Sequence, residues 1–401
     1  MKVLAISTWF PYPPDNGSKM RAYNLLRHFG SMHALDIIAM SQSKKDTEHA
    51  EEVQAFCRRT AVFPEPRFRP GRMSSWSGFF SSVPRYFREH HSVQVEALAS
   101  KWSHEEDYDA IIAVTLGAAP YAAKARAPFK ILDQHNVEYQ VIRRRCQVER
   151  SFLKRLRYTP TWIKAAKFER TLAAEFDAIA VVSTEEQTLM DKLLNHSSLT
   201  HVIPNGVDPS LLDFSAPKKP GTLIFTGALS YQPNYDAALV LCRDVLPAIR
   251  SQFPDTRLRI TGRSDGIDMS RFPSDPSVEF TGYVEDIRPV VASASALVAP
   301  FRFGGGTRLK ILEAMALGTP VVSTPMGAEG IEIENGVHML LGESSADLAY
   351  QTARILSDPE FGEWIARNAR ALVAERYQWP AIAGSFERVI SLGVERKANA
   401  S

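Results

Sequence analysis

The chain has 401 residues, of which 45% are apolar and 23% charged, and its formal net charge is +2. This length suffices for two α/β domains with full cores. No apolar run reaches the roughly 18 residues of a membrane span, and the spacing of Cys57, Cys146 and Cys242 matches no zinc or redox motif, so we expect reduced thiols in the cytoplasm.

The charge is unevenly distributed along the chain. Residues 1–200 carry a net charge of +6 and residues 201–401 a net charge of −4. A basic first half within a nearly neutral whole predicts that one face meets an anionic partner.

The first residues predict a strand followed by a ligand-binding loop. Residues 1–7 are typical of a buried strand and not of a signal peptide, because no cleavage-type segment follows. Residues 8–19 are rich in proline, asparagine and glycine, and a helix is expected from about Ser18. Open α/β sheets bind ligands at such loops, where Gly17 would let the backbone approach a phosphate or an acceptor sugar.

Two segments of the first half combine cations with apolar side chains. Residues 67–88 contain five arginines among aromatic residues, and residues 143–170 contain ten Lys and Arg against Glu149 and Glu169. Both suit an anionic membrane surface or a lipid-linked acceptor. The alternative is that the aromatic rings pack on the domain and the charges face solvent. Nucleic acid is not expected as a partner, because no binding motif accompanies the cations.

A polar segment follows the strand predicted from residue 130. It reads Asp133-Gln-His-Asn-Val-Glu138, which puts His135 at the carboxyl edge of a sheet, where ligands bind. The alternative is a structural histidine that bonds to Asp133 or Glu138. Further strands are expected at 35–40, 60–63, 109–115 and 178–183.

The second half alternates strands and helices. The proline-containing segment 209–221 is the best candidate for a linker. Strands at 223–226, 258–261, 278–281 and 297–301 are separated by helices such as 235–250 and 287–294. Such alternation predicts a parallel, doubly wound sheet.

Residues 299–324 predict a strand, a glycine loop, a helix from Thr307 and another strand. The helix start would favour an anion such as phosphate, with Arg308 and Lys310 adding two cations. Glu313 would lie about 10 Å further along the axis, at 1.5 Å per residue, where it could accept from ribose hydroxyls. The alternative is a solvated Arg/Lys pair and an exposed glutamate on an ordinary helix.

The nineteen residues from Gly304 to Val322 resemble the donor-site signature of glycosyltransferase family 4. The loop at Gly17 and residues 133–138 and 201–208 resemble further segments of that family. The resemblance implies an α/β GT-B fold, with two Rossmann-like doubly wound domains facing across a cleft. Residues 1–205 with a crossover helix at 378–401 would bind the acceptor, and residues 206–377 the nucleotide sugar.

The resemblance also implies the site residues. His135, Arg308 and Lys310 would be catalytic, with His135 positioning the donor sugar. No metal and no cofactor are expected beside a UDP- or GDP-sugar donor. The donor-binding residues would be Gly17, Gly227, Tyr283, Val284, Gly305, Gly306, Thr307 and Glu313.

The chain departs from the family pattern at three positions. Gly305 stands where a glutamate commonly touches the donor sugar, and Ala228 and Pro233 stand where many members place Arg and Lys against the diphosphate. We expect Arg308 and Lys310 to supply the missing cations. This combination resembles a sub-pattern of bacterial exopolysaccharide glycosyltransferases.

These features together predict a retaining, metal-independent hexosyltransferase. It would move a hexosyl group from the nucleotide sugar to a glycan or lipid-linked glycan acceptor in bacterial surface polysaccharide biosynthesis. We expect it in the cytoplasm, either free or attached peripherally to the inner face of the membrane. Two rivals stay open, a nucleotide-sugar epimerase of the same fold and a catalytically silent nucleotide-sugar-binding subunit.

Overall fold

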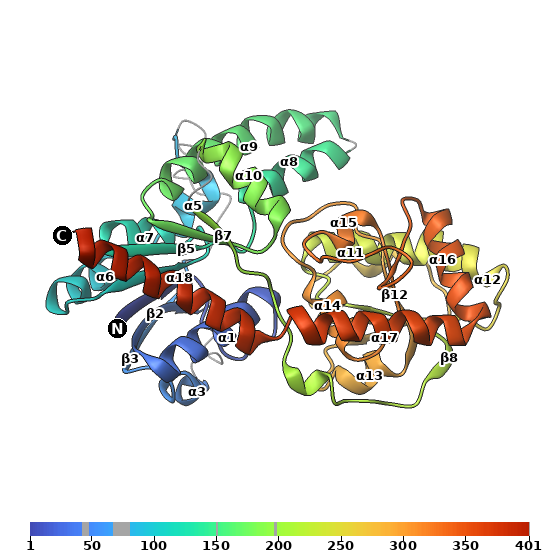
Figure 1. The fold of residues 1–401 in the computed structure, drawn as a ribbon. Helices are drawn as coiled ribbons and strands as arrows, with labels where there is room; N and C mark the ends of the chain where they lie inside the picture. The colour runs from blue at the N-terminus through green and yellow to red at the C-terminus, as the bar shows by residue number, and fades with distance from the viewer. Residues whose placement is uncertain (42–47, 67–80, 150, 196–198, 401) are drawn as a thin grey trace. The chain divides into compact units, whose positions relative to one another are not determined.

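Figure 1 shows a computed structural model of the chain, which describes residues 1–41, 48–66, 81–149, 151–195 and 199–400. Residue contacts divide it into two compact units. The first unit comprises Met1–Pro204 with Pro380–Ser401, and the second comprises Asn205–Trp379. Each is an α/β domain and is described by itself.

The first unit is built on a parallel sheet. Its strands are near-continuous apolar runs, as in β4, where all five side chains are buried, because helices cover both faces of such a sheet. In the described residues seven strands pair in the order β3-β2-β1-β4-β5-β6-β7. Their bounds are β1 Lys2–Ser7, β2 Ala34–Ser41, β3 Arg59–Pro64, β4 Ala110–Val114, β5 Phe129–Asp133, β6 Ala178–Val181 and β7 Thr200–Val202.

The helices of the first unit include one from the far end of the chain. Gly393 of α18 packs so closely on Phe129 that an added Cβ would lie 2.2 Å from the ring, and His33 contacts Glu387 of the same helix at 3.0 Å. The described helices are α1 Gly17–Met32, α3 Ala50–Gln54, α5 Arg85–Glu89, α6 Val93–Glu105, α7 Ala119–Lys124, α8 Glu138–Val148, α9 Phe152–Ala173, α10 Thr184–Leu194 and α18 Trp379–Ala400.

The second unit repeats this architecture. Six strands pair in parallel in the order β10-β9-β8-β11-β12-β13. The sheet begins inside the segment predicted as a linker, since β8 starts at Lys219. The bounds are β8 Lys219–Thr226, β9 Arg257–Thr261, β10 Val278–Gly282, β11 Ala294–Ala299, β12 Val321–Ser323 and β13 Leu340–Leu341.

The helix predicted at 235–250 is interrupted. It divides into α11, a π-helical turn at Leu241–Val245, and α12, because Pro247 has no N–H to continue the α-helical ladder. The helices of this unit are α11 Gln232–Val240, α12 Leu246–Arg250, α13 Arg288–Ala292, α14 Leu309–Ala316, α15 Pro325–Ala328, α16 Ser345–Ser357 and α17 Pro359–Arg376, with short 3₁₀ turns at Pro209–Leu211 and Met269–Arg271.

Both sheets contain a topological switch point. In the first unit the strand order reverses between β1 and β4, and in the second between β8 and β11. At such a point the loops that leave the carboxyl ends of the two strands diverge, and the space between them is where open α/β sheets bind ligands. Each unit therefore has one position at which a site is expected.

Candidate functional site

The glycine loop lies at the switch point of the second unit. It follows β11, which ends at Ala299, and leads into α14 at Leu309. Gly304 and Gly306 have φ values of 136° and 67°, a region that favours glycine because a Cβ would clash with the backbone. Gly304 and Gly306 therefore serve the turn itself.

Arg308 precedes helix α14. Its φ of −82° and ψ of 89° are not helical, so the helix predicted from Thr307 begins at Leu309 instead. The Arg308 guanidinium turns back on the loop, where Nη1 donates to the carbonyl oxygens of Gly305 and Gly306, the latter at 2.6 Å. The Arg308 guanidinium thus bridges two carbonyl groups of the glycine loop.

Lys310 reaches across to the other strand of the switch point. Its Nζ donates to the carbonyl oxygen of Thr226, the last residue of β8, and to Oδ1 of Asn234 at 2.7 Å. The ammonium also lies 4.5 Å from the ring centroid of Phe225 and 5.1 Å from that of Phe301. Lys310 therefore ties α14 to the loop that follows β8.

The two cations share one aromatic ring. Arg308 Cζ and Lys310 Nζ each lie 5.1 Å from the centroid of Phe301. Burial lowers the pKa of Lys310 to about 7, and the positive charge of Arg308 adds to this, while Glu313 opposes it. An anion bound here would raise that pKa again and would be attracted to both cations.

Gly227 leaves room for this lysine. A Cβ on Gly227 would lie 2.4 Å from Lys310 Nζ and 2.6 Å from Asn234 Nδ2, and the φ of Gly227 is 132°. Gly262, which follows β9, packs on Gly227 just as closely, since its Cβ would lie 2.4 Å from the Gly227 carbonyl carbon. The loops after β8 and β9 are thus in backbone contact, a fit that only glycine permits.

The other residues predicted for the donor lie in the same unit. Glu313 is partly buried in α14, where burial raises its pKa and Lys310 opposes the shift. Thr307 is buried. Val284 is partly buried beside Tyr283, whose side chain is 60% exposed with the Arg263 guanidinium 5.1 Å from its ring centroid.

A cavity of about 120 Å³ marks the switch point of the first unit. It lies between the loops that follow β1, β4 and β5, and His135 is part of its wall. Gly17 is exposed at the start of α1, and its neighbour Ser18 lines the cavity. The wall is rich in aromatic and histidine side chains: Thr8, Trp9, Ser18, Met40, Glu65, Tyr86, Phe87, His90, His91, Thr115, Leu116, Gly117, Pro120, Tyr121, His135, Asn136 and Glu138.

The backbone of this wall is strained at one position. Thr115, immediately after β4, has a φ of 72°, which is unfavourable for a β-branched residue. Its Oγ1 lies 3.0 Å from Oγ1 of Thr8, and Gly117 packs so closely on Thr8 that a Cβ there would lie 2.7 Å from the Thr8 methyl carbon. Such strain concentrates at functional sites, which supports a ligand at this edge.

His135 belongs to a buried polar chain. Arg21 of α1 donates from Nη2 and Nε to Asp133 Oδ1 at 2.7 and 2.9 Å, and its Nη1 donates to the carbonyl oxygens of Ile203 and Pro204. His135 Nε2 lies 3.0 Å from Asp133 Oδ2. Although burial alone would raise the pKa of Asp133, the adjacent Arg21 and His135 hold it well below its usual range.

A second buried carboxyl group fixes the loop that contains His135. Glu169 of α9 accepts hydrogen bonds from the backbone N–H groups of Glu138 and Tyr139, both at 2.9 Å, and from the side chain of Gln134. Burial raises the pKa of Glu169 to about 8, although the N–H of Tyr139 opposes the shift. The pKa of Glu138 is raised to about 7, also by burial.

These raised pKa values predict a pH-dependent stability. Between an ordinary glutamate pKa near 4.5 and about 8, Glu169 keeps its proton in the folded chain and loses it in the unfolded one. Its contribution to stability is therefore fully present below about pH 4.5 and falls, by at most about 1.4 kcal/mol per pH unit, until about pH 8. Chemical denaturation of wild type and Glu169→Gln between pH 5 and 9 should show a flatter profile in the variant. Equal profiles in Glu169→Gln, wild type and the exposed control Glu360→Gln would contradict this.

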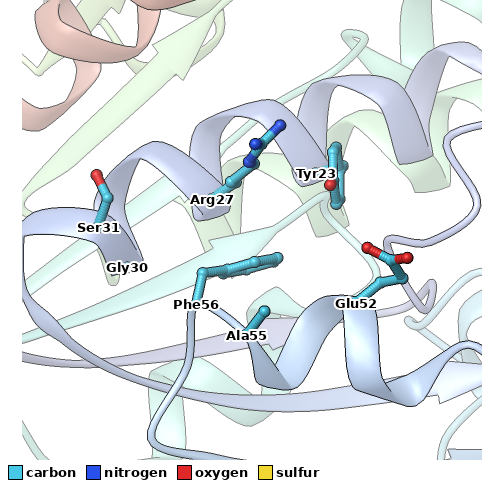
Figure 2. Close-up of a pocket in the computed structure, with 7 residues that line it drawn as sticks. All are labelled: Tyr23, Arg27, Gly30, Ser31, Glu52, Ala55 and Phe56. Atoms are coloured by element: carbon cyan, nitrogen blue, oxygen red, sulfur yellow. The ribbon is translucent and has the colours of Figure 1, made fainter.

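A larger hollow of about 320 Å³ lies elsewhere in the first unit, between α1 and the segment around α3 (Figure 2). Tyr23, Arg27 and Ser31 line it from the helix, and Glu52 and Phe56 line the opposite side. None of the predicted site residues lines this hollow. It therefore plays no part in the candidate site.

The structure brings most of the predicted residues to the two switch points. Gly227, Gly305, Gly306, Arg308 and Lys310 surround the β8–β11 edge, as the contacts above show. Sequence reasoning missed Asn234, Thr115 and Arg21. Thr115 is identified by its positive φ, and Arg21 is identified by its ion pair with the distant Asp133. Neither feature leaves a local sequence signal.

Two family models match consecutive parts of the chain. The model described as Glycosyltransferase Family 4 matches residues 15–211, and the model described as Glycosyl transferases group 1 matches residues 220–358. The chain is 33% identical over 201 residues to the phosphatidyl-myo-inositol mannosyltransferase of Mycobacterium leprae, which is 47% of this chain and 52% of that protein. The match therefore spans about half the length of this curated relative.

Solved structures match over almost the whole chain. Sucrose-phosphate synthase from Thermosynechococcus elongatus superposes with a TM-score of 0.73 and 17% identity, covering 100% of both chains. The Anabaena protein HepE in complex with UDP-glucose superposes with a TM-score of 0.69 and 17% identity, covering 98% of this chain and 100% of that one. Together with the two family models, this shows that the chain belongs to glycosyltransferase family 4 and has its GT-B fold of two Rossmann-like domains.

Proposed function

We propose that the chain transfers a hexosyl group from a UDP- or GDP-sugar to a hydroxyl of a glycan or lipid-linked glycan, with retained configuration, in bacterial surface polysaccharide biosynthesis. One observation carries the proposal: Arg308 and Lys310 converge on Phe301, beside a glycine loop at the switch point of the second unit. This edge offers a diphosphate two cations and the positive end of the helix dipole at the start of α14. The mannosyltransferase relative and the UDP-glucose bound to HepE agree with such a donor.

The leaving diphosphate would be stabilised here without a metal ion. Fixed cations and a helix terminus act on developing negative charge most strongly where water is excluded, and Lys310 is already desolvated enough to shift its pKa. In this arrangement Lys310 and Arg308 would neutralise the leaving group. Glu313 would hold the ribose, and His135 of the first unit would position a sugar hydroxyl.

Transfer of radiolabelled sugar tests the proposed function. We expect the purified full chain to move label from UDP- or GDP-hexose to acceptors of a bacterial membrane extract, in excess EDTA, with the donor's anomeric configuration retained. Interconversion of nucleotide sugars without transfer would indicate the epimerase. Donor binding without any turnover would indicate the silent subunit. Activity lost in EDTA and restored by Mn²⁺ would overturn the metal-independent mechanism.

Glu313→Gln is expected to weaken donor binding. The substitution removes one charged hydrogen bond to the ribose, which is worth about 1.5–3 kcal/mol, or roughly 10- to 150-fold in Kd. Titration calorimetry with UDP measures the change, and a thermal melt checks that the fold is kept. Glu279→Gln is a suitable control, because this glutamate lies on β10, where it pairs with Arg259 at 2.8 Å. An unchanged Kd in Glu313→Gln would remove the ribose role.

We also propose that the first unit docks on an anionic membrane surface through α9. None of the described helices has the length and apolar character of a membrane span. Along α9, however, Phe152, Leu156 and Ile163 are exposed and lie within about 40° of one another at 100° per residue. Leu153 beside them is 76% exposed, and exposed large apolar side chains of this kind mark an interaction surface.

Cations surround this apolar stripe. Lys154, Arg155 and Arg157 are exposed on the same turns as Phe152 and Leu156.

The other segment predicted to meet the membrane is residues 67–88, of which residues 67–80 lie outside the described part of the chain. Phe87 in its remainder packs on Phe168 with ring centroids 4.9 Å apart, which supports the packing alternative for that ring. The membrane proposal therefore rests on α9.

Sedimentation with vesicles tests this surface. Each Lys or Arg near an anionic surface contributes about 1 kcal/mol, and an inserted Phe or Leu side chain contributes about 1.5–3 kcal/mol. We expect binding to anionic and not to neutral vesicles, lost as salt rises, and reduced at least 10-fold by Phe152→Ser with Leu156→Ser. Val93→Ser changes an equally exposed apolar residue on α6 and should have no effect. Equal sedimentation of wild type and double variant would contradict the proposal.

A further inference from the structure

The buried chain Arg21–Asp133–His135 determines where the imidazole proton lies. Arg21 is 1% exposed and donates to Asp133 Oδ1 at 2.7 and 2.9 Å. Oδ2 faces His135 Nε2 at 3.0 Å and also accepts a longer bond from Arg21 Nε at 3.2 Å. Asp133 is ionised, because its pKa is held far below neutrality, and an ionised carboxylate can only accept hydrogen bonds. His135 Nε2 must therefore be the donor and carry the proton.

When the ring is neutral, the other ring nitrogen then has a lone pair. In a neutral imidazole with its proton on Nε2, Nδ1 is an acceptor. His135 is 92% buried, lines the cavity at the β1–β4 switch point, and its Nδ1 has no hydrogen-bond partner within the described part of the chain. A buried acceptor without a partner is costly, so it predicts a ligand group that donates.

We propose that Arg21 and Asp133 are positioning residues that hold His135 in the Nε2–H tautomer, so that Nδ1 accepts a hydrogen bond from a hydroxyl of the bound sugar. That the hydroxyl belongs to a sugar rests on the proposed function. The tautomer itself follows from the contacts of Asp133 and does not depend on turnover. A ligand oxygen without a hydrogen could not make this bond.

Asp133→Asn should reverse the tautomer. Arg21 requires an oxygen acceptor, and its two contacts to Oδ1, at 2.7 and 2.9 Å, are shorter than its contact to Oδ2 at 3.2 Å. The asparagine oxygen should therefore occupy the Oδ1 position and place the amide nitrogen opposite His135. That nitrogen donates, so Nε2 must give up its proton and Nδ1 must take one. A donor would then face the sugar hydroxyl where the wild type has an acceptor.

Nitrogen-15 NMR of the full chain, labelled at histidine, measures this directly. The His135 signals are those missing from His135→Gln. We expect the Nε2–H tautomer in wild type and in Arg21→Lys, which keeps a cation beside Asp133, and the Nδ1–H tautomer in Asp133→Asn. With the donor and acceptor that the wild type turns over, kcat of Asp133→Asn should fall about 10²- to 10⁴-fold, as expected for a misplaced proton, with a smaller change in KM.

Several results would overturn the proposal. An Nδ1–H tautomer in wild type would do so, and this measurement stands even if Asp133→Asn fails to fold. An unchanged tautomer in Asp133→Asn would do the same, as would a reversed tautomer with unchanged kcat. Absence of any sugar transfer by the wild type would count against the proposed function and the sugar as ligand, while the wild-type tautomer would still decide the role of Asp133.

Discussion

Lys310→Ala is expected to lower kcat for sugar transfer by about 10²–10³-fold, with a smaller effect on donor binding. Loss of one preorganised group at a developing negative charge typically costs this much. The charge on the leaving diphosphate grows in the transition state, so the lysine contributes more there than in the donor complex. Ala228 and Pro233 carry no charge, whereas Lys310 and Arg308 each place a cation at this edge.

Lys218→Ala is a matched control for this variant. Lys218 is also a lysine whose ammonium is desolvated, which lowers its pKa to about 8. It donates to the carbonyl oxygens of Ala294 and Gly318 at 3.2 and 2.9 Å. It lies at the opposite edge of the same sheet, beside the start of β8 and β11. Loss of Lys218 should change the melting temperature and leave kcat almost unaltered. Near-wild-type turnover in both Lys310→Ala and Arg308→Ala would show that another cation, such as Arg263 or Lys19, neutralises the diphosphate.

Gly227→Ala is expected to impair both stability and transfer. The new methyl group would lie 2.4 Å from Lys310 Nζ and 2.6 Å from Asn234 Nδ2, so the lysine must move or the loop after β8 must shift. Overpacking of this kind costs about 1–3 kcal/mol, in addition to the strain of a φ of 132°. Displacement of Lys310 should lower kcat toward that of Lys310→Ala.

Gly266→Ala separates backbone strain from overpacking. Gly266 lies in the same unit with a φ of 71°, and an added Cβ would have nothing within 4 Å. The free energy of unfolding of Gly266→Ala should fall only by the roughly 1–2 kcal/mol that a left-handed backbone costs a residue with a Cβ, and kcat should be unchanged. Chemical denaturation and steady-state kinetics on both variants measure the difference. Equal kinetics in Gly227→Ala and wild type would show that the position of Lys310 is not limiting.

The sequence was sufficient for the fold because its signals are local and repeated. Apolar runs such as 110–114 are bounded by turn residues, and their alternation with helical segments predicts two parallel sheets, which the strand orders confirm. Element ends were less predictable. The start of α14 depends on the positive φ of Gly306 and the non-helical backbone of Arg308, whereas the residue pattern from Thr307 alone is helical.

The candidate site was predictable only where its residues are neighbours in sequence. The glycine loop, Arg308, Lys310 and Glu313 lie within ten residues, so a helix start and two cations could be recognised together. Regular helix geometry places Arg308 and Lys310 about 200° apart, but Arg308 lies outside the helix and both cations reach Phe301.

Long-range partners were not predictable. Arg21 and Asp133 are separated by 112 residues, and Lys310 and Asn234 by 76. Only the order of strands in each sheet brings such pairs together. The sequence therefore predicts which residues carry charge, while the fold determines which of them act together.

A crystal structure of the full chain with UDP or GDP bound tests the donor site most directly. We expect the diphosphate at the β8–β11 switch point, within hydrogen-bond distance of Lys310 Nζ and beside the N–H groups at the start of α14, with the ribose hydroxyls on Glu313. A diphosphate held away from both Arg308 and Lys310, or bound in the cavity of the first unit, would contradict the proposed donor site.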